Sequence, residues 1–589
     1  MELRWDLEDL YTGFETDDFQ SDLNEIDNKI AEINTWIENN LNQQQDKVEQ
    51  IEEFIELLRD FRAKYSLLVK YAQLKLSVDA NNNQAASYVE QLEKKESNLT
   101  KARVAFQKWL GGLDNLEEVI AESELLRNHE FYLKELARES QYLLSDEEEV
   151  TISKLQTTGS SAWYKLKQKL VSNLMVEITI DGEEQELPLS KVRNMAYDSD
   201  QAKRKKAYQA ELESYSKIEE PVASCLNSIK GEAITLSNRR GYESPLEKSL
   251  ISSRLEQDVL DAMLEAMQES LPDFQKYYRK KAELLGHEGG LPFYDLFAPV
   301  GSAEMKFNYD GAQDFIINNF RTFSDSLADY AQRAFENNWI DAEPRAGKNG
   351  GAFCMNIHSL GQSRILANFE GSFSNVSTLA HELGHGFHGE CLKEESIFNT
   401  DYPMPLAETA SIFCETIIQK AALEEADKEQ QLGILENSLM GAGQVIVDIY
   451  SRYLFEKEVF AQRQESSLAV EELKEIMIAS QKKAYGDGLD SEYLHPYMWI
   501  NKIHYYMPGF DFYNYPYAFG LLFGKGLYAQ YQEQGADFVA EYKNLLAATG
   551  KKDVVEVAKM MDIDLTKVKF WRQSLDIIKD DIETFINHS

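Results

Sequence analysis

Two histidines and a glutamate form the most informative cluster in the sequence. In the run His381-Glu382-Leu383-Gly384-His385 the imidazoles are four residues apart, and a carboxylate follows the first. On a helix this spacing stacks His381 and His385 about one turn apart on one face, where they could bind one metal ion together. Glu382 lies about 100° around the helix, so it could reach a water on the metal without being a ligand. The pattern predicts the zinc site of a hydrolase.

The alternative interpretation of this stretch is an ordinary amphipathic helix. Its apolar stripe, which a buried helix explains, consists of Val376, Leu379, Ala380, Leu383 and Phe387. A buried helix does not explain two histidines and an acid at metal spacing on the other side. With nine histidines among 589 residues, about 0.02 such matches are expected by chance. We therefore expect one Zn²⁺ per chain.

A catalytic zinc ion needs three protein ligands and an open position for water. His388 lies about 10 Å along the helix axis from His381, too far to complete a tetrahedron. The metzincin pattern also fails, because His388 stands where that pattern requires Gly and Cys391 where it requires His. The third ligand must come from elsewhere in the chain.

A later stretch offers a better third ligand. Pro403 and Pro405 precede a predicted helix on which Glu408, Ser411 and Glu415 share one face. A polar face on a helix rich in Leu, Ile and Phe needs a partner if it is buried, and a metal site provides one. We predict Glu408 as the third ligand, with Ser411 and Glu415 orienting the histidines. An exposed helix carboxylate is the alternative role for Glu415.

Two short strands are predicted before the metal helix, at residues 352–356 and 363–369, followed by a turn at Glu370-Gly371. The second strand leads directly to the helix. Its free edge could pair with an extended peptide and place a scissile bond at the metal. A small internal sheet is a compatible alternative.

Most of the remaining chain is predicted to be helical. From about residue 17 to 170, apolar residues recur in steps of three and four, which predicts long antiparallel helices. The alternating run from Met175 ends in Asp181-Gly182 and predicts a small hairpin near 175–187. A domain boundary soon after it gives an N-terminal helical domain, 1–195, and a second helical domain, 196–589, that carries the predicted zinc site and would be the catalytic domain.

Composition excludes several classes of partner. A net charge of −39 and a pI near 4.7 disfavour binding to nucleic acid or to anionic membranes. The chain shows no signal-peptide pattern and no apolar stretch long enough to span a bilayer. Four scattered cysteines form no C-x-x-C pair, which suits a reducing compartment. We expect a cytoplasmic protein.

Together these residues resemble oligoendopeptidase F and, more remotely, the thimet oligopeptidase group of zinc peptidases. Beside the metal segments, the resemblance rests on the runs Trp5–Tyr11 and Tyr294–Pro299. It covers essentially the whole chain and maps the third zinc ligand of the family onto Glu408. We expect a mainly α-helical fold, a two-lobed multi-helix shell enclosing a deep substrate cleft, with a small β-sheet beside the zinc helix. The resemblance implies substrates that are short oligopeptides.

A tyrosine-rich stretch runs from Ile503 to Gly520. Composition alone favours aromatic packing for most of its rings. The resemblance implies instead that a histidine and tyrosines of this run lie near the substrate carbonyl. On that basis we predict that His504 and Tyr515, with Tyr513 as a further candidate, donate hydrogen bonds to the oxyanion. The stretch between His504 and Tyr513 is slightly longer here than in the family pattern.

The sequence thus predicts a zinc metalloendopeptidase of the gluzincin type that hydrolyses internal bonds of oligopeptides. The metal activates a water, and Glu382 takes its proton and returns it to the leaving amine. One alternative is a zinc amidase or deacylase that acts on other substrates. The other is a non-catalytic helical scaffold whose zinc helix is structural, which would require four protein ligands.

Overall fold

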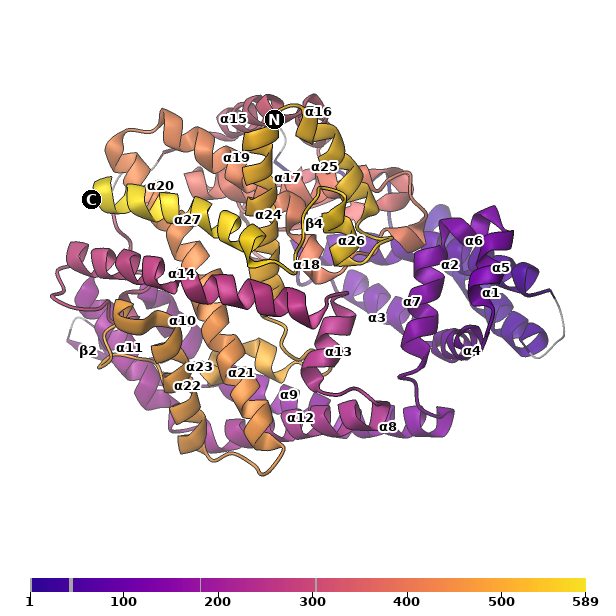
Figure 1. The fold of residues 1–589 in the computed structure, drawn as a ribbon, viewed down its shortest axis with the longest axis horizontal. Coiled ribbons are helices and arrows are strands. Elements are labelled where there is room, and N and C mark those ends of the chain that lie inside the picture. The colour runs from indigo at the N-terminus through magenta and orange to yellow at the C-terminus, as the bar shows by residue number, and fades with distance from the viewer. Residues whose placement is uncertain (1–2, 42–45, 181, 302–304, 589) are drawn as a thin grey trace. The chain divides into compact units, whose positions relative to one another are not determined.

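Helices make up most of the protein, and its two β-sheets are small (Figure 1). The structure, a computed structural model, describes residues 3–41, 46–180, 182–301 and 305–588. The predicted mainly α-helical fold with a small sheet beside the metal helix is confirmed. Among the described helices, none is long and apolar enough to cross a membrane.

The chain divides into two compact units, and each is assembled from three segments. Unit 1 comprises Met1–Leu143, Lys306–Ala421 and Tyr531–Asp562, and unit 2 comprises Leu144–Met305, Ala422–Gln530 and Ile563–Ser589. The division into an N-terminal domain, 1–195, and a catalytic domain, 196–589, stays a prediction.

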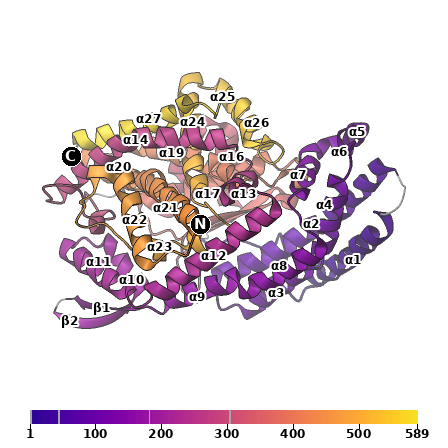
Figure 2. The same cartoon turned by 60° about the horizontal axis from the view of Figure 1, so that its bottom comes forward.

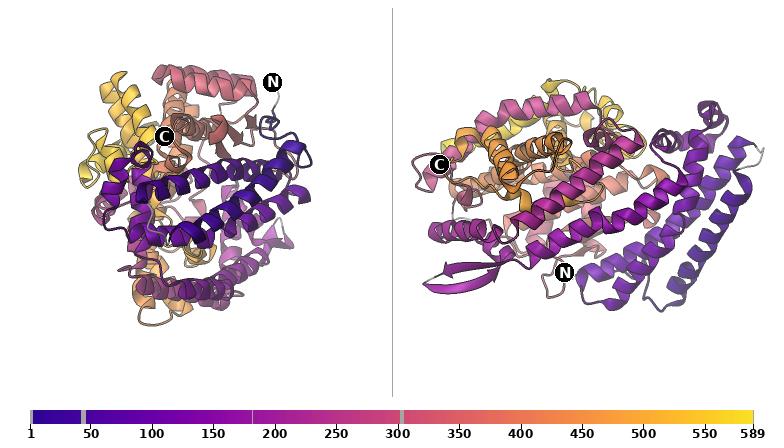
Figure 3. Two further views of the ribbon diagram at one scale, coloured as in Figure 1. Left: turned by 90° about the vertical axis from the view of Figure 1, so that its right-hand side faces the viewer. Right: turned by 90° about the horizontal axis from the view of Figure 1, so that it is seen from below.

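Unit 1 begins with two long helices, α1 (Asp17–Asn40) and α2 (Lys47–Val78). They lie side by side (Figure 3). The indole of Trp36, late in α1, donates to Glu53, early in α2. Lys64, further along α2, donates to Asp22, early in α1, so the two helices run antiparallel, as predicted. Their apolar residues at steps of three and four are buried in one core. The other helices of unit 1 are α3 (Asn83–Ser97), α4 (Thr100–Gly111), α5 (Leu116–Glu122), α6 (Glu124–Asn128), α7 (Glu130–Ser140), α15 (Tyr309–Phe323), α16 (Asp325–Glu336), α17 (Phe373–Cys391), α18 (Met404–Ala407), α25 (Asp537–Ala548), α26 (Val554–Lys559) and most of α19 (Thr409–Glu425).

A three-stranded sheet in unit 1 has the order β3-β5-β4. Its strands are β3 (Ile340–Asp341), β4 (Phe353–Ile357) and β5 (Gln362–Leu366). Strand β5 lies in the centre, parallel to β3 and antiparallel to β4. The expectation of a free edge on the strand at 363–369 is therefore wrong, because this strand is paired on both sides. The outer edge on the other side of the hairpin belongs to β4.

The N-terminal run Trp5–Tyr11 joins this sheet to the helices of unit 1. The backbone N–H of Asp6 donates to Asn338 O at 2.8 Å. The buried Arg364 of β5 donates through Nε to Asp6 O, also at 2.8 Å. Leu7, Leu10 and Tyr11 are buried in the same core as α1 and α2. This part of the family resemblance has a structural role, since it ties the sheet to the helical core.

Unit 2 contains the hairpin of β1 (Met175–Ile180) and β2 (Glu183–Pro188), which pair antiparallel. The hairpin lies beside α10 and α11 (Figure 2). The turn residue Asp181 lies outside the described residues. The other helices of unit 2 are α8 (Asp146–Thr158), α9 (Ser160–Ser172), α10 (Leu189–Asn194), α11 (Gln201–Tyr215), α12 (Glu219–Arg240), α13 (Pro245–Ser252), α14 (Gln257–Leu284), α20 (Lys428–Gly443), α21 (Ile449–Arg463), α22 (Val470–Tyr485), α23 (Met498–Asn501), α27 (Val568–His588) and most of α24 (Tyr515–Gln534).

Candidate metal centre

Helix α17 carries the H-E-x-x-H run, and its start is defined by local sequence. Gly371 adopts φ +92°, which turns the chain at the predicted position. Ser372 caps the helix by accepting from Asn375 N, and the Asn375 side chain accepts from Ser372 N in return. This reciprocal capping satisfies backbone donors that a helix start leaves free. The apolar stripe predicted for the helix is buried.

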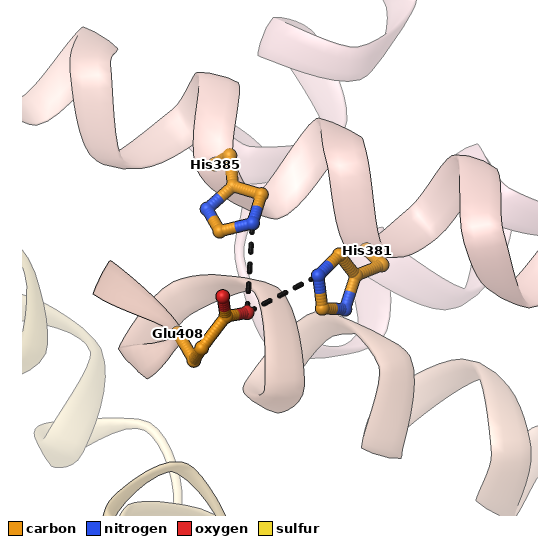
Figure 4. Close-up of side chains that lie close together, drawn as sticks. All are labelled: His381, His385 and Glu408. Atoms are coloured by element: carbon orange, nitrogen blue, oxygen red, sulfur yellow. Dashed lines mark ion pairs between the residues drawn. The ribbon is translucent and has the colours of Figure 1, made fainter. Parts of the chain in front are cut away.

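Three side chains converge on one point beside α17. Glu408 Oε2 lies 3.2 Å from His381 Nε2 and 3.5 Å from His385 Nε2 (Figure 4). One ligand atom from each residue lies within 4.8 Å of the other two. Two ligands of a tetrahedral zinc ion, each at its usual bond length, are about 3.3 Å apart. The spacing and the donor types therefore fit one zinc ion.

Glu408 lies at a junction between two helices. It follows α18 and immediately precedes α19, so the continuous helix predicted there is interrupted at the proposed ligand. Ser411 Oγ donates to Glu408 Oε2 at 2.8 Å, and thus orients the carboxylate rather than a histidine. Glu415 Oε2 lies 3.2 Å from His381 Nδ1. Glu415 therefore contacts the ring nitrogen of His381 that does not face Glu408, as its position on the predicted helical face suggested.

A glycine lets the two parts of the centre approach each other. A Cβ atom on Gly384 would lie 2.6 Å from Ala410 O and 2.6 Å from Ser411 Cα. These are backbone atoms at the start of α19, and they cannot yield as a flexible side chain would. A side chain at position 384 would push the segment that carries Glu408 away from α17.

A chain of hydrogen bonds ties the sheet to the metal helix. Tyr330 OH donates to Ser363 Oγ at 2.9 Å, and Ser363 Oγ donates to Asn356 Oδ1 at 2.9 Å. Asn356 Nδ2 then donates to the carbonyl of His385 at 3.2 Å. Strands β4 and β5 therefore hold the turn of α17 that carries the second histidine.

The charges of the centre favour a cation. Burial disfavours protonation of His381, but hydrogen bonds to Glu408 and Glu415 outweigh burial and raise its pKa to about 10. Burial lowers the pKa of His385 to about 4. Burial alone would raise the pKa of Glu408, yet the two histidines bring it to about 2. Near neutral pH, Glu408 is therefore ionised and His385 is neutral, and a metal cation could replace the proton that His381 carries.

Glu382 differs from the other carboxylates of the centre. It is 6% exposed, and its Oε2 has no hydrogen-bond partner among the described residues. Burial raises its pKa to about 7. A carboxylate with this environment can accept or release a proton near neutral pH.

His388 points away from this centre. It is fully buried, its Nε2 lies 2.8 Å from Thr549 Oγ1, and its ring stacks on Tyr402 with the centroids 4.1 Å apart. These contacts give His388 a packing role.

In unit 2, the predicted residues of the tyrosine-rich segment separate into two groups. The His504 ring stacks on Tyr513 with the centroids 5.6 Å apart, and Tyr517 contacts both rings edge-on at 6.0 Å. Tyr515 is 1% exposed, and its hydroxyl forms hydrogen bonds of 3.2 and 3.1 Å to Ser249 and Ser253. The structure thus brings together His504 and Tyr513, with Tyr517 added. No helical spacing rule singles out Tyr517, because Tyr513 lies in the turn before α24.

The imidazole of His504 is neutral near pH 7. Burial, reinforced by Arg452 and Lys502, lowers its pKa to about 4. Its Nδ1 is buried and has no hydrogen-bond partner among the described residues. A neutral imidazole can donate one N–H to an oxyanion.

This chain is similar in sequence and fold to known proteins. Residues 194–577 match the sequence model of peptidase family M3, and residues 112–175 match the N-terminal model described as oligopeptidase F. Oligopeptidase PepF of Bacillus subtilis is 24% identical, over 85% of this chain and 75% of its own length. Group B oligopeptidase PepB of Streptococcus agalactiae is 24% identical, over 95% and 93%. The crystal structure of oligoendopeptidase-F from Enterococcus faecium superposes with a TM-score of 0.71 and 19% identity, covering 96% of this chain and 99% of that one.

The helical fold and the family match together define a metallopeptidase. More particularly, the chain belongs to peptidase family M3, as an oligopeptidase of the oligoendopeptidase F type. The resemblance inferred from the motifs is confirmed.

Proposed function

We propose that this protein is a zinc-dependent endopeptidase of the gluzincin type that hydrolyses internal peptide bonds of short oligopeptides. The convergence of His381, His385 and Glu408, with Glu382 buried beside them, carries the proposal. Two imidazoles and one carboxylate are the donor set of a catalytic zinc ion, whereas a structural site would need a fourth protein ligand. The proposal places the protein in the cytoplasm, where its four free cysteines would stay reduced.

When bound, zinc would supply a Lewis acid that polarises the substrate carbonyl and acidifies a water molecule. Oε2 of Glu382 would accept a proton from the attacking water and pass it to the nitrogen of the leaving amine. Glu415 would accept from Nδ1–H of His381 at 3.2 Å and so keep Nε2 directed towards Glu408.

The outer edge of β4 supports binding of an extended peptide. Ile365 N donates to Trp339 O on the β3 side of β5. Cys354 is the antiparallel partner of Ile365 in β4, so its backbone N–H and C=O point to the outer edge. Asn356 points the same way, and its carbonyl accepts from Lys70 Nζ at 2.8 Å. A substrate could add to β4 as a further strand at Cys354.

His504, Tyr513 and Tyr515 complete the proposal as donors to the oxyanion. His504 and Tyr513 support it by their stacked arrangement and by the neutral imidazole. Tyr515 would have to release its hydroxyl from Ser249 and Ser253 to take part. One well-aimed donor contributes about 3 kcal/mol to transition-state stabilisation.

A Glu382→Gln variant tests the central step. We expect it to retain one zinc per chain and to lose about 100- to 10,000-fold in kcat on a fluorescence-quenched peptide, because the general base is gone. A matched control is Glu390→Gln on the same helix, whose carboxylate contacts Arg333 instead. Near-normal turnover by zinc-loaded Glu382→Gln would refute the mechanism. Cleavage of non-peptide amides in preference to a peptide library would favour an amidase.

A further inference from the structure

A buried lysine lies at the meeting point of three parts of unit 2. Lys230 of α12 is 1% exposed, and its Nζ lies 2.7 Å from Glu456 Oε1 of α21 and 3.0 Å from Asp511 Oδ1. Both carboxylates are also buried. Asp511 belongs to the tyrosine-rich segment, two residues before Tyr513. We call Lys230, Glu456 and Asp511 the lysine cluster.

Stability alone does not account for the lysine cluster. Taking three charges out of water costs more than their attraction returns unless the geometry is very good, and apolar residues of similar volume are often as stable. Asp511 Oδ2 is buried and has no hydrogen-bond partner among the described residues. The role of the lysine cluster is therefore to be sought in the backbone that it holds in place.

The cluster holds a backbone conformation directly before Tyr513. The Glu456 oxygen that accepts from Lys230 also accepts from Phe512 N at 3.1 Å. Phe512 has φ +55°, a left-handed conformation that is unfavourable for a residue with a side chain. The hydrogen bond to Glu456 stabilises this turn. The turn directs the next residue, Tyr513, against His504.

Two further contacts fix the segment on either side of Tyr513. Lys248 Nζ donates to Gly509 O at 3.0 Å, and Arg452 donates to Asn514 Oδ1 at 3.2 Å. Phe510 between them is 51% exposed and is not held in this way. Basic side chains from α12, α13 and α21 therefore anchor residues 509, 511 and 514.

We propose that Lys230 is a positioning residue for peptide hydrolysis. Through Asp511 and Glu456 it fixes residues 509–514, so that Tyr513 and His504 keep the stacked arrangement in which both can face a substrate. This inference rests on the role proposed above for those two residues. It gives the longer stretch between His504 and Tyr513 a purpose, since that stretch contains the anchoring Asp511.

Unit 2 offers a matched control for this test. Lys281 is also fully buried and pairs with the buried Glu436 at 2.5 Å, but its other contact is to Leu296 O and not to the tyrosine-rich segment. Lys281→Met therefore removes an equivalent buried pair without touching that segment. Glu436→Gln serves in the same way as a control for the milder variant Asp511→Asn.

We expect Lys230→Met and Asp511→Asn to lower kcat for a short peptide about 10- to 100-fold, with KM changed little, because a misplaced donor weakens the transition state more than binding. Lys281→Met and Glu436→Gln should keep kcat at a temperature at which all variants are folded. Hydrogen exchange should become faster at residues 509–514 in Lys230→Met and not in Lys281→Met. Asp511→Asn keeps the test decisive if Lys230→Met does not fold.

A double-mutant cycle separates positioning from general destabilisation. In a Tyr513→Phe background, Lys230→Met should cost much less in kcat than it does alone, because both changes remove one interaction. Full additivity, or an unchanged kcat in Asp511→Asn, would overturn the inference. If Tyr513→Phe and His504→Gln both leave kcat unchanged, the role proposed for these two residues in catalysis is refuted, and the inference about Lys230 is refuted with it. Glu382→Gln tests the metal centre separately.

Discussion

Two carboxylate clusters, one in each unit, have different partners. In the lysine cluster of unit 2, as in the pair of Lys281 and Glu436, the cation belongs to the chain and is permanent: Lys230 lies between Glu456 and Asp511. In unit 1 the partners of Glu408 and Glu415 are imidazoles.

This difference separates a scaffold from an exchangeable site. Lysine stays charged near neutral pH, so its cluster keeps one charge state and one shape. Imidazole can give up its proton and use the same nitrogen to bind a metal ion. We therefore expect the carboxylates of the lysine cluster to have a structural role, and Glu408 with its two imidazoles to accept a cation from outside the chain.

Removing the carboxylate of Glu408 should have the largest effect on activity. In Glu408→Gln we expect the zinc content to fall well below one per chain. Activity should fall about a thousandfold or more, because a Lewis acid contributes several kcal/mol to the transition state. Metal analysis after dialysis and kcat/KM on a quenched peptide measure both. Glu436→Gln in unit 2 is the control and should keep its zinc. A fully loaded Glu408→Gln would break the comparison.

Gly384→Ala sharpens the comparison without changing any charge. The added Cβ would clash with backbone at the start of α19 and displace Glu408. We expect zinc affinity to fall about 10- to 100-fold, similar to the loss of a residue that orients a ligand. Gly441→Ala in α20 is the control, because nothing lies within 4 Å of its added Cβ. Competition with a zinc chelator measures the affinity, and equal values for both variants would contradict this account of the close approach.

The pair of Lys281 and Glu436 in unit 2 should be replaceable, unlike the proposed metal ligands. Lys281→Met alone should cost about 3 to 5 kcal/mol of unfolding free energy, because it leaves Glu436 buried and unpaired. The double variant Lys281→Met/Glu436→Leu should recover most of that loss and keep its activity. Urea unfolding of the single and double variants measures the difference. A double variant no more stable than the single one would show that the pair itself is stabilising.

The smallest effect is expected at His129, a buried histidine without a carboxylate partner. Its pKa shift, and therefore the pH dependence of the stability it contributes, has the opposite sign to that of His381. His129 is 5% exposed and contacts Leu125 O and Ser396 Oγ, and burial lowers its pKa. Below pH about 6.5, His129 binds a proton in the unfolded chain, whereas in the folded protein it stays neutral to lower pH. The stability that neutral His129 contributes is therefore lost as pH falls. Between pH 7.5 and 5.5, metal-free wild type should lose up to about 1.4 kcal/mol more than metal-free His129→Gln. Urea unfolding at both pH values checks this, and equal losses would disprove it.

Much of the metal centre could be predicted from local spacing. The positions of His381 and His385 follow from the pitch of a helix, and the capping sequence at Ser372 defines where that helix begins. Glu408 could be predicted from the polar face of a later stretch, although the helix breaks at that residue. The segment around Tyr513 was harder to predict, because the sequence does not show which of its five tyrosines stacks on His504.

By itself, the sequence determined the helical class, the family and the candidate metal-binding run, since each depends on residues close together or on motifs read in order. Only the tertiary structure decided that β5 is central and that β4 has the outer edge. Only it placed Lys230 beside Glu456 and Asp511, which lie 226 and 281 positions further along the chain. Contacts over such separations depend on how whole helices pack, and periodicity within one segment contains no information about its distant partner.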